Sequence, residues 1–188
     1  MNNALYETLP DNYMGYQIDT SYQTTIQVDA ILNDAELSAY EAVELAVSFL
    51  FGENELPESM WIDALIWWIN GWSHDNVVSS NDNEEPVMDF YQDQWRIISA
   101  FRSQYGIDLT DANTDMHWWM FMGLLSTLND CAFTRACDIR GQTIDSDMAP
   151  KEKARIKKLK KMYVIQNDEE KAEIEDEKAR ILRILDGD

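Results

Sequence analysis

The first half of this chain lacks basic residues altogether. Residues 1–95 contain neither Lys nor Arg, yet they contain 18 Asp and Glu residues. The whole chain of 188 residues has a formal net charge of −20. A field of this sign repels nucleic acid phosphate and keeps a protein in solution, so we expect no nucleic-acid partner. A sharper interpretation of the same charge is a partner, or a neighbouring copy, that presents a basic surface.

Long apolar runs are also missing. The longest unbroken run is residues 118–125, eight residues, whereas a membrane span requires about 20. The N-terminal residues have no basic region and no apolar segment of signal-peptide length. We therefore expect no membrane partner and an intracellular location.

Cysteine and histidine are scarce, with two residues of each. The two cysteines, Cys131 and Cys137, are not expected to form a disulfide in a reducing compartment. A metal site would need more ligands, and His74 and His117 are distant in sequence. The phosphate-binding, dinucleotide-binding and serine-hydrolase motifs are absent from the sequence. We expect a protein that is not an enzyme and that holds no cofactor or metal.

One short motif resembles a calcium loop. Asp111, Asn113 and Asp115 match its first three ligand positions. Met116 and Met122 then occupy the positions that require glycine and a bidentate glutamate. We interpret these acidic residues as helix-capping residues instead.

Aromatic residues are abundant. The chain has 21 of them, seven of which are tryptophan, and each can bury roughly 150–250 Å². Their helical spacing predicts a mainly α fold, a compact multi-helix bundle. A short N-terminal hairpin is expected between Ala4–Thr8 and Gly15–Ile18. The expected helices cover residues 20–32, 38–52, 57–72, 89–105, 116–128, 133–140, 151–163 and 167–186.

Several helix ends carry local signals. Ser38 and Glu41 form a capping-box pattern. Gly106 follows Tyr105 at the expected end of a helix. Thr110 or Thr114 is expected to cap the central helix that begins near residue 116.

The charge pattern suggests how the chain is divided. We expect one helical domain over residues 1–165 and a charged C-terminal helical extension over residues 166–188. Residues 151–161 contain seven basic residues and one acidic residue. In so acidic a protein, we expect this basic helix to pair with the acidic body or an acidic partner. Residues 73–85 have the composition of a long loop.

The expected helices over residues 57–72 and 116–128 are each apolar over a wide face, and two interpretations are possible. Wide apolar faces usually pack into a core, and this is the interpretation we favour. Alternatively, part of them forms a groove or ridge for a partner helix, because large exposed apolar patches mark interaction sites. The residues expected to bind a client protein under this hypothesis are Trp61, Leu65, Trp68, Trp72, Trp118, Trp119, Phe121, Met122 and Leu125.

The central segment resembles the gene-product-fifteen family, small tail proteins of siphophages with Gram-positive hosts. The most specific part is His117-Trp118-Trp119, which follows Tyr105-Gly106-Ile107-Asp108-Leu109. The likeness covers about residues 5–165. The loop over 73–86, which is acidic and polar here, and residues 167–188 depart from the family pattern. Supporting matches are Leu9-Pro10, Ile18-Asp19-Thr20, Trp67-Trp68 and Met162-Tyr163.

The resemblance implies a tail assembly chaperone rather than an enzyme. Such a protein binds and solubilises the helical tape measure protein in the host cell cytoplasm before the tail tube polymerises, and it is absent from the mature virion. A second tail assembly chaperone and self-association are further expected partners. Two alternatives are an acidic DNA mimic that acts against host defence, supported by charge alone, and a structural tail subunit that stays in the virion.

Overall fold

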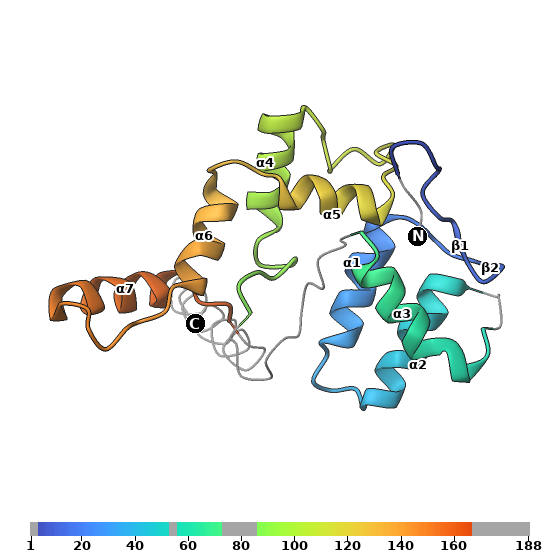
Figure 1. Ribbon diagram of the computed structural model, residues 1–188, viewed down its shortest axis with the longest axis horizontal. Coiled ribbons are helices and arrows are strands. Elements are labelled where there is room, and N and C mark those ends of the chain that lie inside the picture. Colours follow the sequence, from blue (N-terminus) through green and yellow to red (C-terminus); the bar gives the residue numbers. More distant parts are fainter. Residues whose placement is uncertain (1–3, 53–55, 73–85, 167–188) are drawn as a thin grey trace, which may run out of the picture. The chain divides into compact units, whose positions relative to one another are not determined.

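Helices dominate the computed structural model, which describes residues 4–52, 56–72 and 86–166 (Figure 1). The mainly α fold predicted from the sequence is confirmed. The predicted 73–85 loop and 167–186 helix lie outside the described residues. The elements are β1 (Asn12–Tyr13), β2 (Tyr16–Gln17), α1 (Tyr22–Leu32), α2 (Ala39–Phe51), η1 (Glu58–Met60), α3 (Trp61–Asn70), α4 (Gln94–Tyr105), α5 (Trp118–Ser126), α6 (Ala132–Gly141) and α7 (Pro150–Tyr163).

The chain divides into two compact units. Unit 1 comprises residues 1–83 and 96–129, and unit 2 comprises residues 84–95 and 130–188. The boundary falls within α4, whose first two residues belong to unit 2. A single domain over residues 1–165 followed by an extension stays a prediction. No helix among the described residues is long and apolar enough to cross a membrane.

The N-terminal hairpin forms, but its first strand is a different segment from the one predicted. Asn12 pairs with Gln17 and Tyr13 with Tyr16, so the predicted pairing of Ala4–Thr8 is wrong. Met14 and Gly15 make the turn with φ values of 49° and 91°. A two-residue turn with positive φ at both positions matches the twist of the flanking strands, which fixes the register here.

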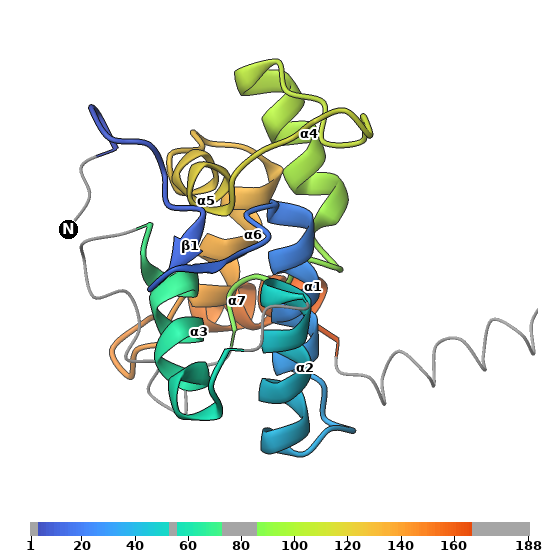
Figure 2. The same cartoon turned by 90° about the vertical axis from the view of Figure 1, so that its right-hand side faces the viewer.

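Local capping sets the first two helices. The Ser21 side chain accepts from the Gln23 backbone N–H at the start of α1. The predicted capping box of α2 is confirmed: Ser38 Oγ accepts from Glu41 N at 3.3 Å, and Glu41 Oε2 accepts from Ser38 N at 3.0 Å. Helix α2 packs against both α1 and α3, and Figure 2 shows these helices side by side.

Helix α3 begins later than predicted. Pro57 has an extended ψ of 136°, and a single 3₁₀ turn precedes the α-helix, which starts at Trp61. The helix ends at Asn70, so Trp72 lies beyond it rather than on its last turn.

Helix α4 also begins later, at Gln94 rather than at Asp89. Asp89 instead caps a turn, because its Oδ1 accepts from Gln92 N at 2.6 Å. The buried side of α4 consists of Ile97, Ala100 and Phe101, whereas Trp95 is 68 % exposed. The expected end at Gly106 is confirmed, since its φ of +70° is a conformation that glycine adopts without a steric penalty.

Helix α5 is positioned by residues far away in the sequence. Ser21 and His117 form an antiparallel bridge, in which Tyr22 N donates to Met116 O and Trp118 N donates to Thr20 O. The starts of α1 and α5 therefore lie side by side.

The cap of α5 is His117 and not a threonine. His117 Nδ1 accepts from Trp119 N at 3.0 Å. Thr110 and Thr114 bond to the side chain and backbone of Asp108 instead, so the predicted threonine cap is wrong. Both hydrogen bonds therefore lie within the segment that connects α4 to α5.

Aromatic rings form the centre of unit 1. Phe121 of α5 is 1 % exposed and stacks on Tyr22 of α1 and Phe101 of α4, at centroid distances of 4.8 and 5.1 Å. Trp68 of α3 is fully buried, and its indole N–H donates to Thr25 of α1 at 3.0 Å. Helices α1, α3, α4 and α5 thus share one core.

Unit 2 is organised by a buried ion pair. Arg140 of α6 contacts both carboxylate oxygens of Asp93, at 2.5 and 3.1 Å, and both side chains are nearly inaccessible. Arg140 also donates to the carbonyl oxygens of Val87 and Tyr163. One guanidinium therefore ties the segment before α4 and the end of α7 to α6.

Candidate protein-interaction surface

The nine residues predicted to bind a client lie at two depths in unit 1. Five of them belong to the core, with exposed fractions of 5 % or less. The other four are half-buried. That these nine residues contact a client protein stays a prediction. The core residues are Leu65, Trp68, Trp118, Phe121 and Leu125, and the half-buried ones are Trp61, Trp72, Trp119 and Met122.

The tryptophans among them join α3 to α5. Trp119 Nε1 donates to the backbone carbonyl of Trp68 at 2.8 Å. Trp67 contacts Trp119 edge-to-face at 5.3 Å and Tyr13 of the hairpin at 5.1 Å. Gly71 lies so close to the Trp119 ring that a Cβ atom there would collide with it and with the Trp67 carbonyl. These contacts hold α3 in a fixed orientation.

The exposed apolar surface of α3 lies on its other side. Ile62 and Ile66 are 54 % and 55 % exposed, one helical turn apart. Tyr40 of α2 is 55 % exposed, and its ring lies 6.0 Å from that of Trp61. We call Tyr40, Trp61, Ile62 and Ile66 the α2–α3 face. Neither isoleucine is among the residues selected from the sequence as client contacts.

Two carboxylates lie close to Tyr40 on this face. The pKa of the Tyr40 hydroxyl is raised above its usual value, mainly by the negative charge of Glu58 and then by burial and by the charge of Glu44. The sequence provides no Lys or Arg anywhere in residues 1–95 to offset these acids. The α2–α3 face thus combines exposed apolar side chains with two acidic residues beside Tyr40.

His117 is half-buried in unit 1, where it caps α5. Burial lowers the pKa of its imidazole, an effect that the Pro10 carbonyl and Asp11 partly oppose. Its Nε2 lies 2.9 Å from Pro10 O, while Nδ1 accepts from the α5 backbone. Only the neutral imidazole can donate from one nitrogen and accept at the other. The folded unit therefore favours uncharged His117.

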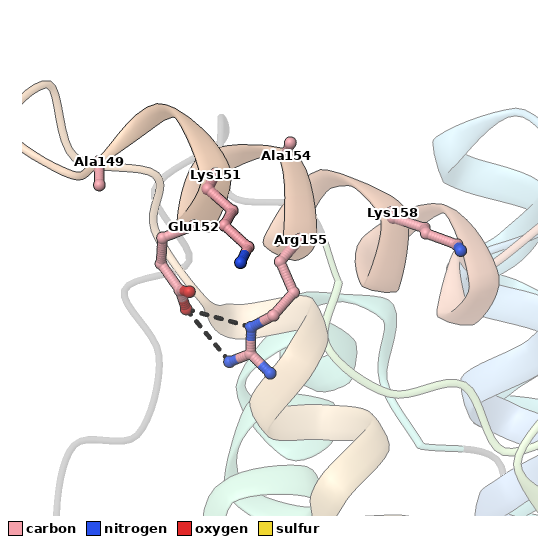
Figure 3. Close-up of a pocket in the computed structure, with 6 residues that line it drawn as sticks. All are labelled: Ala149, Lys151, Glu152, Ala154, Arg155 and Lys158. Atoms are coloured by element: carbon pink, nitrogen blue, oxygen red, sulfur yellow. Dashed lines mark hydrogen bonds and ion pairs between the residues drawn. The ribbon is translucent and has the colours of Figure 1, made fainter.

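A second candidate surface lies on α7 in unit 2 (Figure 3). A shallow hollow of about 590 Å³ has cationic and small apolar residues around it. Arg155 is paired with Glu152 at 3.1 Å, whereas Lys151 and Lys158 are exposed. We call it the α7 hollow; its lining residues are Ala149, Lys151, Glu152, Ala154, Arg155 and Lys158.

Two features of the described residues concern metal binding and thiol chemistry. These residues contain no group of three or more His, Cys, Asp or Glu residues placed to hold a metal ion. Cys131 and Cys137 are both free thiols. Burial, followed by the charge of Asp93, raises the pKa of Cys137 to about 11, which keeps this thiol protonated at neutral pH.

Comparison with known proteins gives one match. The family model described as Bacteriophage Gp15 protein matches residues 1–165. No curated protein and no solved structure matches the chain. The matched region includes all of unit 1 and most of the described part of unit 2.

Proposed function

Because the chain belongs to the Bacteriophage Gp15 protein family, we propose that it is a tail assembly chaperone that binds the tape measure protein. A tape measure protein is long and helical with apolar stripes, so it aggregates when nothing covers it. A protein that prevents this needs an apolar surface for amphipathic helices and an acidic exterior that keeps the client in solution.

The observation that carries the proposal is the α2–α3 face. Ile62 and Ile66 expose more than half of their surface one turn apart on a helix that is fixed from behind by Trp68 and Trp119. Apolar side chains at positions i and i+4 lie on the same face of a helix, and one helix binds another through residues with this spacing. The tryptophans act as the rigid support of this surface, and the isoleucines make the contact.

The remaining parts of the proposal concern location and partners. The protein acts in the host cell cytoplasm, is not an enzyme and is absent from the mature virion. A second tail assembly chaperone joins it on the client. Mass spectrometry of purified particles distinguishes this role from that of a structural tail subunit, because a subunit would be found in the particles.

Co-expression with the tape measure protein of the same phage tests the proposal. The wild-type chain should increase the soluble fraction of the client, and the variant I62S/I66S should not. The matched control is L45S/F49S, which changes two apolar residues of α2 that are exposed to a similar extent, 40 % and 45 %. This control should solubilise the client like the wild type. An insoluble client with every form of the protein would refute the chaperone function, and equal loss in both variants would refute the assigned face.

A further inference from the structure

The cationic surface of this protein is concentrated on one anchored helix. Seven of the basic residues of the chain lie in residues 151–161. Within α7 only Ile156 is buried, and Arg140 bonds the carbonyl at the end of the helix. The helix is therefore held by one side and by its end, and most of its basic side chains face outward.

The α7 hollow combines positive charge with small side chains. Ala149 and Ala154 leave room between the longer residues, and Lys151, Arg155 and Lys158 supply three cations, of which Arg155 is paired with Glu152 (Figure 3). The alkyl stems of such residues cover apolar groups while their charged ends stay in water. A suitable occupant carries an exposed ring with carboxylates beside it, since cations also interact favourably with aromatic faces.

We propose that the α7 hollow docks the α2–α3 face of a second copy of this chain. Tyr40 of one copy enters the hollow of the next. Glu44 and Glu58, which lie beside Tyr40, replace solvent around the basic side chains. Each copy carries both surfaces, so the contact is head-to-tail and extends to further copies or closes into a ring.

Charge complementarity selects a second copy as the occupant. The acidic half of the chain contains no basic residue and the α7 segment contains one acid among seven bases. The net charge of −20 acts over a longer range, but the Debye length is about 8 Å at physiological ionic strength, so the local pairs dominate at contact. This inference rests on the charges of α7 and of Glu44 and Glu58 beside Tyr40, and not on the client contacts proposed for Ile62 and Ile66.

Two charge-reversed variants of the full chain test the proposal. The first, K151E/R155E/K158E, removes the cations of the hollow; the second, E44K/E58K, reverses the acids beside Tyr40. Sedimentation velocity at physiological salt should show concentration-dependent association of the wild type. Each variant alone should associate at least about tenfold more weakly, because like charges then meet in the contact. The control K171E/K178E/R180E makes the same change in net charge as the first variant. It should retain at least about half of the association constant of the wild type.

Mixing the two variants gives the decisive measurement. Each retains one native surface, so an equimolar mixture should form a heterodimer, while circular dichroism confirms that both are folded. A wild type that is monomeric at all concentrations, or a mixture that stays monomeric, would overturn the proposal. Association that begins only when residues 167–188 are deleted would also overturn it, and would assign the hollow to the acidic end of the chain itself.

Discussion

The buried Arg140–Asp93 pair allows a quantitative prediction for unit 2. Arg140 makes two contacts with the Asp93 carboxylate and donates to the carbonyl oxygens of Val87 and Tyr163. The substitution R140M retains an unbranched apolar stem like that of arginine but removes every one of these contacts. Asp93 is fully buried, so its charge loses the partner that compensates for desolvation. Removing one member of a buried pair costs about 3–5 kcal/mol.

A second substitution identifies the cause of this cost. D93N removes the charge but retains an oxygen that can accept from Asp89 N, as Asp93 does at 3.2 Å. In the R140M background, D93N should therefore recover about 1–3 kcal/mol of the free energy of unfolding. The control R155M disrupts the exposed Glu152–Arg155 pair and should cost no more than about 1 kcal/mol.

Urea unfolding followed by circular dichroism gives the free energies. Hydrogen exchange of peptides from α6 and α7 assigns the loss to unit 2, because the two units need not unfold together. An R140M variant that costs less than about 1 kcal/mol would refute the reasoning. So would a double variant that is no more stable than R140M.

Three further predictions concern single residues. Burial lowers the pKa of His117 below 6.5, so the contribution of this residue to stability is fully present above that pH and is lost as the pH falls through the folded pKa. H117N keeps a capping side chain but does not titrate. The urea midpoint of this variant should therefore depend less on pH between about pH 7.5 and 5.5 than that of the wild type. G71A should lower the thermal midpoint because its Cβ collides with neighbouring atoms. G123A has open space and should raise the thermal midpoint slightly, because alanine is favoured over glycine in a helix by about 0.5–1 kcal/mol. Mass spectrometry of timed alkylation at neutral pH should show Cys137 reacting more slowly than Cys131, since its pKa is raised to about 11.

Local sequence chemistry predicted most helix boundaries. The α2 capping box needs only Ser38 and Glu41, three residues apart, and Gly106 ends α4 through its own backbone conformation. The signals that failed depend on distant contacts. The α5 cap arises because Thr20 and Ser21 bridge to the start of that helix, and no pattern within residues 110–118 reveals this.

The candidate surface could be predicted only in outline. In α3 both the buried Trp68 side and the exposed Ile62–Ile66 side are apolar, so composition cannot distinguish them. The direction of burial is set by Trp119, which approaches from α5. The Arg140–Asp93 pair, 47 residues apart in the chain, likewise has no local sequence signal.

The bridge between Ser21 and His117 places two helix origins together. Each N-terminus carries about half a positive charge from its aligned peptide dipoles, so α1 and α5 repel one another where they meet. Asp19 lies at this point, where it accepts from Ser21 N and from Thr24, and Asp115 is two residues before the bridge. Some of the acidity of the chain therefore neutralises its own backbone, and replacing these aspartates to make the protein less anionic would loosen the junction of its two central helices.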